Sequence, residues 1–166
     1  RKFQGGSGSG LDVATSWHGQ VISFAEQQAT PQVWPEDWTF LAIFTGTSAS
    51  TPKHLQRFST WRAAGRTRTL DDLCDAARHL HEELSESNLA GYIEALQRFD
   101  ADAGVGIYSD AHIQLTHLAA SCGVLYKPCG AGGGDIGLAF VRAGKTDAGL
   151  QAFREQANRQ FHVLNI

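Results

Sequence analysis

The chain has 166 residues, which is enough for one ordinary domain with a sizeable core. Its 14 Lys and Arg against 17 Asp and Glu give a formal net charge of −3. The chain therefore lacks the overall positive charge of a nucleic-acid-binding protein, although a local pocket can still be positive and bind a small anion. Three cysteines without metal-ligand spacing, no membrane-length apolar run and no signal-peptide pattern predict a cytoplasmic protein without a membrane partner. The chain contains no methionine and begins at Arg1, so we expect a piece of a longer protein.

The first ten residues, RKFQGGSGSG, have the composition of a Gly/Ser linker. They nevertheless continue without a break into a helical pattern that begins near Leu11, followed by a strand over 21–24, which favours native sequence over a linker. Ser7 and Ser9 in the glycine-rich turn are either plain turn residues or donors to a substrate or phosphate oxygen. Asp12, taken by itself, is suited to the start of the helix.

The next elements are a loop, a buried strand and a helix. Residues 25–37 are polar with two prolines and predict a loop or an irregular hairpin connection. The run 38–44, WTFLAIF, predicts a buried strand that ends in a loop rich in small hydroxyl residues. Ser50 or Thr51 is expected to be the N-cap of the following helix, with Pro52 at its first position.

Two amphipathic helices are predicted over 70–84 and 89–99, because leucines and aromatic residues recur there at three- and four-residue steps. A loop is expected over 100–106, and another helix from about 109 to a C-terminal glycine at Gly123. Histidines two residues apart on the first of these helices point away from each other, so the sequence predicts no metal site.

A glycine-rich segment, KPCGAGGGDIGLAF over 127–140, lies between two strand-like runs. Glycines can take positive φ, and successive amides of such a turn can form a concave anion site. The composition leaves two alternatives open, a loop that holds phosphate or a tight structural corner. A last helix near 150–157 and a strand at 161–164 complete an α+β domain with its helices on one side.

Three segments resemble the GHMP kinase superfamily, whose members include galactokinases, homoserine kinases, mevalonate kinases and phosphomevalonate kinases. The sequence KPCGAGGGD resembles the third motif of that superfamily, and its Lys-Pro opening and its Asp are most similar to the bacterial phosphomevalonate kinase branch. The sequence GSGLDVA resembles a segment at the junction of the two lobes, and FTGTSAST resembles a WTGxxAST segment of the same branch. The resemblance covers essentially the whole chain.

The resemblance implies a ferredoxin-like antiparallel sheet with added helices, the C-terminal domain of these kinases. Residues 1–24 then form the interlobe segment with its helix and first strand, and 25–166 the C-terminal domain. The phosphate loop of the PxGxGLGSSAA type and the metal-binding Ser and Glu of the superfamily do not occur in this sequence. They belong to the N-terminal ATP-binding lobe, which we expect to be absent from this chain.

The implied function is transfer of the γ-phosphoryl group of ATP to phosphomevalonate, a precursor in isoprenoid synthesis. ATP and Mg²⁺ would be bound mainly by the missing lobe, and this piece alone would be inactive. In the superfamily the Asp of the junction motif faces the substrate, which makes Asp12 the catalytic candidate. The other implied site residues are the substrate-binding Ser7, Ser9, Ser48, Ser50, Thr51 and Lys127, and the nucleotide-phosphate loop Gly130, Ala131, Gly132, Gly133, Gly134 and Asp135.

Several alternatives remain at this point. The acceptor could instead be mevalonate or a sugar, or the chain could be a non-catalytic binding lobe that reuses the fold. For any single hydroxyl of Ser48, Ser50 or Thr51, helix capping alone is at least as well supported as substrate binding. Cys129 stands where the superfamily often has Ser, and is either a reactive thiol or a small packing residue. We expect Asp12 and the glycine-rich corner to meet at one rim.

Overall fold

The computed structural model describes residues 10–19, 21–25, 27–142 and 147–164. The chain forms two compact units, Arg1–Glu36 and Asp37–Ile166. The sequence analysis expected the division after residue 24, which lies inside strand β1 (Ile22–Ala25). The first unit extends to Glu36 because β1 pairs with a second strand, β2 (Gln28–Pro31). The sequence analysis expected a loop or an irregular hairpin connection in that stretch.

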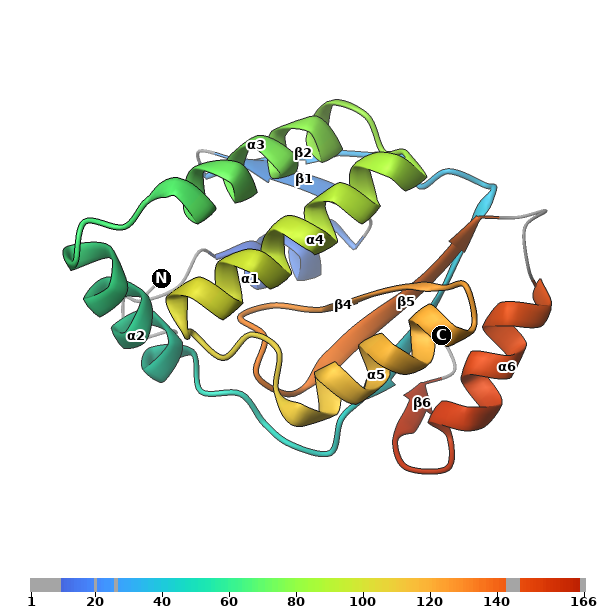
Figure 1. Cartoon of the computed structure of the whole chain (residues 1–166). Coiled ribbons are helices and arrows are strands. Elements are labelled where there is room, and N and C mark those ends of the chain that lie inside the picture. Colours follow the sequence, from blue (N-terminus) through green and yellow to red (C-terminus); the bar gives the residue numbers. More distant parts are fainter. Residues whose placement is uncertain (1–9, 20, 26, 143–146, 165–166) are drawn as a thin grey trace. The chain divides into compact units, whose positions relative to one another are not determined.

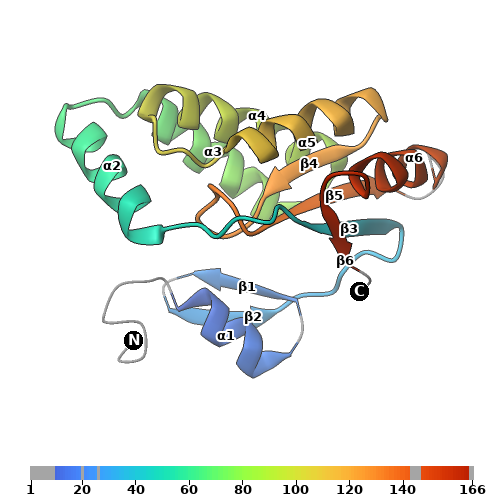
Figure 2. The same cartoon turned by 90° about the horizontal axis from the view of Figure 1, so that it is seen from below.

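The first unit is a short helix, α1 (Leu11–His18), and the β1–β2 hairpin (Figure 2). Gly10 with φ 80° precedes the helix, and Gly19 with φ 64° ends it by donating its N–H to the carbonyl of Thr15. Both positions have a left-handed backbone conformation, which glycine adopts without steric cost, and this conformation ends the helical path of the chain at Gly19. No side chain of α1 is buried. A two-stranded ribbon with such a helix has little core of its own.

The second unit is built on a four-stranded antiparallel sheet in the order β4-β5-β3-β6. Its strands are β3 (Trp38–Phe44), β4 (Leu125–Pro128), β5 (Ile136–Arg142) and β6 (His162–Leu164). The long, apolar β3 and β5 pair over their whole length at the centre, while the short β4 and β6 form the edges. This strand order, with helices between the first and second strands and between the third and fourth, is that of a ferredoxin-like fold.

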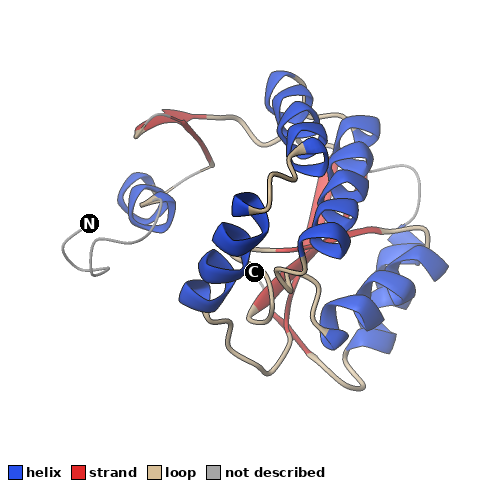
Figure 3. Cartoon of the chain, turned by 60° about the vertical axis from the view of Figure 1, so that its left-hand side comes forward, coloured by secondary structure: helices blue, strands red, loops and turns tan. Residues whose placement is uncertain are grey.

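The helices of this unit are α2 (Thr51–Ala63), α3 (Arg68–Glu82), α4 (Glu86–Ala103), α5 (Asp110–Ser121) and α6 (Asp147–Ala157). Helix α4 lies beside α3, and α5 runs along β4 (Figure 1). Figure 3 distinguishes these helices by colour from the strands that run through the unit. No helix among the described residues has the length and apolar composition that a bilayer crossing requires.

The main core lies between one face of the sheet and helices α5 and α6. Leu115 of α5 and Phe153 of α6 are fully buried against Ile43 of β3 and Ala139 of β5, which are both fully buried as well. Ile43 and Ala139 point to the same face because side chains alternate along paired strands. The expected α+β fold, with an antiparallel sheet and its helices on one side, is therefore confirmed.

Helix α4 extends further than the sequence predicted. Residues 100–103 were expected to begin a loop, but the helix continues to Ala103 and ends at Gly104, whose φ is 60° and whose N–H donates to the carbonyl of Asp100. The Asp100 side chain is buried and turns to the loop that follows. The expectation of a loop from Asp100 onward is thus wrong, because a left-handed glycine rather than the acidic residue marks the helix end.

Candidate functional site

The glycine-rich loop of 129–135 connects β4 to β5 at one end of the sheet. Gly130, Gly132 and Gly133 have φ values of 61°, 72° and 79°, and Asp135 has a φ of 56°. Side chains other than Asn and Asp rarely adopt this left-handed conformation, so the loop depends on glycine and aspartate at these places. The resulting turn is tight, since the N–H of Gly132 bonds to the carbonyl of Cys129 at 3.1 Å.

Close neighbours also require glycine in the loop. A Cβ atom at Gly132 would lie 2.7 Å from the Cα of Ile107, and one at Gly133 would collide with the imidazole of His54. Such approaches are shorter than any normal van der Waals contact, so a larger residue would displace a neighbouring segment. The loop is therefore packed tightly against helix α2 and the segment 104–109.

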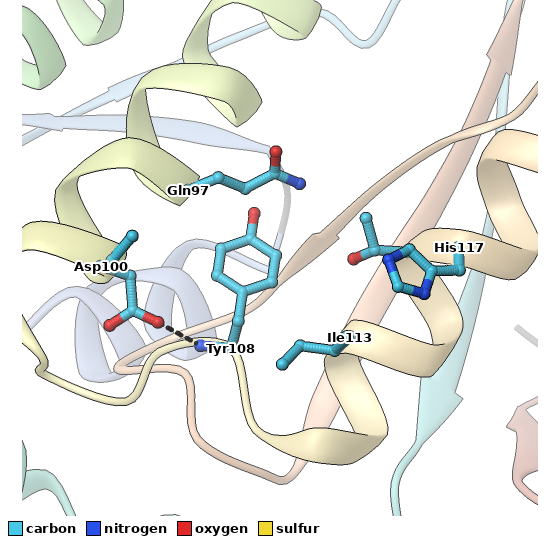
Figure 4. Close-up of a pocket in the computed structure, with 7 residues that line it drawn as sticks. Gln97, Asp100, Tyr108, Ile113 and His117 are labelled. Atoms are coloured by element: carbon cyan, nitrogen blue, oxygen red, sulfur yellow. Dashed lines mark hydrogen bonds between the residues drawn. The ribbon is translucent and has the colours of Figure 1, made fainter.

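The segment 104–109 is held in turn by a buried carboxylate. Asp100 accepts hydrogen bonds from the backbone N–H groups of Gly106 at 2.7 Å, Ile107 at 2.9 Å and Tyr108 at 2.8 Å. Figure 4 shows the bond from Tyr108. The carbonyl of Ile107 then accepts the N–H of Gly133 at 2.7 Å. Asp100 thus fixes the segment that supports the glycine-rich loop.

The far end of the loop lies alongside the hydroxyl-rich segment after β3. The N–H of Asp135 donates to the carbonyl of Thr47 at 2.6 Å, and its carbonyl accepts the N–H of Thr45 at 2.8 Å. The Asp135 carboxylate accepts the N–H of Ala49 at 3.3 Å. Two segments that the sequence analysis assigned separately to substrate and to nucleotide are therefore adjacent.

Two histidines hold carbonyl groups of the loop. His54 Nδ1, in the first turn of α2, lies 3.1 Å from the carbonyl oxygen of Ala131. His112, in the first turn of α5, lies 3.0 Å from the carbonyl oxygen of Gly134 through Nε2 and 2.7 Å from the Tyr126 hydroxyl through Nδ1. His112 is fully buried, and burial lowers its pKa and raises the pKa of Tyr126. The buried pair is therefore uncharged near neutral pH.

The backbone N–H groups of the loop divide into two sets. Those of Cys129, Gly132, Gly133 and Asp135 are donated to protein carbonyls. Those of Gly130, Ala131 and Gly134 have no hydrogen-bond acceptor within the part of the chain that the structure describes. The loop is thus partly a braced structural corner, and three of its amides can still receive an acceptor such as a phosphate oxygen.

The predicted substrate hydroxyls lie at the start of α2. Ser50 is the N-cap, yet its side chain makes no capping hydrogen bond, and Thr51 is the exposed first residue of the helix. Ser48 is also exposed. Lys127, the other predicted substrate residue, is partly buried in β4 and donates from Nζ to the carbonyl of Pro128 at 2.8 Å. The three hydroxyl side chains are therefore near the loop without serving as caps.

Cys129 is half-buried, and burial raises its pKa. A thiol with a raised pKa is a poorer nucleophile at neutral pH, because the thiolate is the reactive form. Of the two alternatives that the sequence left open, the structure favours a small packing residue.

Asp12 belongs to the first unit, where it lines an open surface hollow of ≈ 380 Å³ together with Val13, Ser16 and Trp17. Ser7 and Ser9 lie outside the described residues. The predicted meeting of Asp12 with the glycine-rich loop concerns both units and stays a prediction.

A separate pocket of ≈ 410 Å³ lies between α4 and α5 (Figure 4). The Tyr108 ring points toward Gln97 of α4, while Ile113 and His117 come from α5. None of the predicted site residues lines this pocket. It is connected to the glycine-rich loop through the segment 104–109, because Tyr108 of that segment lines the pocket and the neighbouring Ile107 accepts the N–H of Gly133.

Sequence reasoning missed the residues that hold the loop, namely His54, Asp100, Ile107 and His112. Each is an isolated residue in an otherwise ordinary helical or loop pattern, so nothing in its local sequence announces a role. Among the described residues, no group of three or more His, Cys, Asp and Glu side chains is placed to hold a metal ion.

Comparison with known proteins gives a consistent picture. No protein-family model matches the chain. The curated phosphomevalonate kinase of Streptomyces sp. (strain CL190) is 29% identical over 119 residues, which cover 66% of this chain and 32% of that protein. The chain is GHMP-kinase-like. It matches the C-terminal part of phosphomevalonate kinase and spans about a third of the length of that curated relative.

Two solved structures are similar to this chain in fold. A phosphomevalonate kinase from Streptococcus pneumoniae, in complex with phosphomevalonate and AMPPNP, superposes with a TM-score of 0.73 at 18% identity, over 95% of this chain and 55% of that chain. A Lin0012 protein from Listeria innocua gives a TM-score of 0.64 at 24% identity, over 83% of this chain and 41% of that chain. The α+β architecture is thus that of the GHMP kinase C-terminal domain.

Proposed function

We propose that this chain is the C-terminal lobe of an ATP-dependent small-molecule kinase whose phosphoryl acceptor is phosphomevalonate. The observation that carries the proposal is the contact between the glycine-rich loop and the hydroxyl-rich segment before α2, made through Asp135, Thr47 and Ala49. Three unpaired loop amides and three hydroxyls without capping bonds then lie in neighbouring segments of the second unit. Amides of this kind suit phosphate oxygens, and hydroxyls suit a small polar acceptor.

The comparisons support the choice of acceptor. The curated relative is a phosphomevalonate kinase, and a protein of the same fold binds phosphomevalonate together with an ATP analogue. In the proposed reaction a phosphate oxygen of the acceptor bonds to the γ-phosphorus of ATP, and the bond from that phosphorus to the β–γ bridging oxygen breaks to release ADP. A phosphate acceptor is already ionised at neutral pH, so Asp12 acts mainly to orient it. Ser48, Ser50, Thr51 and Lys127 bind the acceptor, together with Ser7 and Ser9.

The remaining parts of the site are assigned to an N-terminal lobe. We assign the Mg²⁺ that accompanies ATP to that lobe as well, where we expect its Ser and Glu ligands. The first unit buries no side chain of its helix, and Trp17 is 87% exposed. An apolar surface of this kind is suited to packing against a second lobe.

The proposal is tested in the complete protein by changing Asp12→Asn. We expect kcat with phosphomevalonate to fall about 10²–10³-fold while the KM values change little, because the change removes an interaction that acts on the reacting oxygen. Asp71→Asn is the matched control, since Asp71 is also an acidic residue in the first turn of a helix and is exposed. Unchanged turnover in the Asp12 variant would instead favour a non-catalytic binding lobe.

A second experiment tests the division between lobes and the acceptor. The purified chain should show no turnover alone, and mixing it with the N-terminal lobe should restore activity. Full activity of the chain by itself would contradict the proposal. A panel of phosphomevalonate, mevalonate and sugars, assayed with the complete protein, then decides the acceptor, and preference for either of the last two would replace phosphomevalonate.

A further inference from the structure

Among the described residues of the second unit, His112 is the most deeply buried polar side chain, with an exposed fraction of 0%. A buried imidazole is destabilising unless both ring nitrogens have partners. Both have them, since Nδ1 lies 2.7 Å from the Tyr126 hydroxyl and Nε2 lies 3.0 Å from the Gly134 carbonyl oxygen. The network connects helix α5 and strand β4 to the glycine-rich loop.

The partners fix the direction of each hydrogen bond. A carbonyl oxygen only accepts, so His112 Nε2 carries the proton and donates it to Gly134. In the neutral ring Nδ1 is then an acceptor, and the Tyr126 hydroxyl donates to it. The order of donation is therefore Tyr126 to His112 to Gly134, with every step satisfied.

The space for this network is provided by Gly137 of β5. A Cβ atom at Gly137 would collide with the hydroxyl and ring carbons of Tyr126. The Tyr126 side chain is 2% exposed, so it cannot turn into solvent without losing its buried contacts. Gly137 thus allows the phenol to lie across the strand pair and reach His112.

The network acts on one peptide group of the loop. In a trans peptide the C=O and N–H point in opposite directions, and the structure contains no cis peptide bond among its described residues. His112 holds the C=O of the Gly134–Asp135 peptide from one side, and the carbonyl of Thr47 holds its N–H from the other at 2.6 Å. This peptide therefore has a single orientation.

We propose that His112 is a positioning residue for the glycine-rich loop, which keeps the Gly134 carbonyl turned into the protein and so away from a bound phosphate. The role rests on the proposed function, in which the loop contacts the phosphates of ATP. A carbonyl released from His112 is free to turn outward, where its negative end repels a phosphate oxygen. His112 acts through the loop and does not touch the ligand.

His112→Phe in the complete protein tests this role, because it removes both polar contacts and keeps an aromatic ring. We expect the KM for MgATP to rise about tenfold with a small change in kcat, which corresponds to losing the hydrogen bond that fixes one buried carbonyl. His112→Gln should recover most of the loss, because its amide N–H can reach the Gly134 carbonyl. His117→Gln, an exposed histidine of the same helix, is the matched control and should leave both constants unchanged.

Amide hydrogen exchange provides a readout that does not depend on activity. In His112→Phe, exchange should accelerate about tenfold at Asp135, whose N–H shares the held peptide, and stay unchanged at central β3 amides. Equal exchange at Asp135 in both proteins would overturn the positioning role. If His112→Phe does not fold, Tyr126→Phe removes only the donor to Nδ1 and should give a smaller effect in the same direction.

Gly132→Ala separates failure of this inference from failure of the proposed function. It strains the loop directly, through its positive φ and its contact with Ile107. If this variant raises the KM for MgATP and His112→Phe does not, the role of His112 is refuted while the phosphate-binding loop stands. If neither variant changes the KM, the loop does not bind the nucleotide phosphates, and this inference fails together with the assignment of the loop to ATP.

Discussion

The two sides of the glycine-rich loop are held in physically different ways. On the inner side, His112 and Tyr126 are almost completely inaccessible to water and reach the loop from the main core. On the outer side, His54 is half-buried and lies on the first turn of α2, beside the exposed hydroxyls of Ser48 and Thr51. Each side nevertheless contributes one histidine bond to one loop carbonyl.

This difference predicts that the two sides contribute differently to stability. Removing a buried partner leaves a polar group without water, which costs about 1–3 kcal/mol, whereas an exposed partner is replaced by solvent at little cost. Substitutions on the inner side should therefore lower the free energy of unfolding. Substitutions on the outer side should leave it nearly unchanged and affect ligand binding.

The largest effect is expected on the inner side for Gly137→Ala. The added methyl group collides with the buried Tyr126 ring, so we expect the free energy of unfolding to fall by about 2–3 kcal/mol. Gly91→Ala is the matched control, because a Cβ at Gly91 meets nothing within 4 Å and the position lies inside α4. That change should stabilise the chain by about 0.5–1 kcal/mol, since alanine favours helix.

Urea denaturation of the three proteins measures both differences. If Gly137→Ala leaves the free energy of unfolding as high as Gly91→Ala does, the Tyr126 ring can move to make room for the added methyl group. The inner side would then not be the rigid support that the comparison requires.

A smaller effect is expected from the pH dependence of His112. Burial lowers its pKa in the folded chain below the ordinary value of 6.5, and the nearby Lys127 acts in the same direction, while the bond to Gly134 and the Asp135 charge oppose them. As the pH falls below the ordinary value, the unfolded chain takes up a proton that the folded chain does not bind. The free energy of unfolding should then fall by at most about 1.4 kcal/mol per pH unit, until the pH drops below the folded-state pKa.

His112→Gln cannot titrate and should remove this contribution, which shows as a flatter stability profile between pH ~7.5 and ~5. The control His117→Gln should keep the slope of the unchanged chain. A slope that is identical with and without the His112 imidazole would mean that the buried ring exchanges protons with solvent as readily as an exposed one.

The architecture was predictable from the sequence because its signals are local and strong. The apolar run 38–44 and the amphipathic helices have the periodicity that a sheet with helices on one side requires. The glycine-rich segment was also located correctly between two strands. The sequence left open whether this segment is a structural corner or a phosphate loop, and the two are compatible. Of the six N–H groups in residues 130–135, three bond to protein carbonyls and three have no acceptor among the described residues.

The supports of the loop were not predictable, because they depend on contacts between distant segments. His54 lies 77 positions from its partner Ala131, and His112 lies 22 positions from Gly134. No short motif encodes such a distance. Asp100 was expected to lie in a loop, and the three backbone N–H groups that it binds come close to it only when the chain has folded.

The smallest effect on stability, and the sharpest test of the outer side, is expected for Ser50→Ala. Ser50 precedes α2 but makes no side-chain capping bond, whereas Ser85 precedes α4 and accepts the N–H of Asn88 at 3.2 Å. Ser85→Ala should therefore cost about 1 kcal/mol of unfolding free energy, and Ser50→Ala close to zero. In the complete protein Ser50→Ala should instead raise the KM for phosphomevalonate several-fold, because a hydroxyl without a structural bond is available to the acceptor. A loss of stability equal to that of Ser85→Ala, with an unchanged KM, would show that Ser50 is an ordinary helix cap and that the outer side does not bind the acceptor through it.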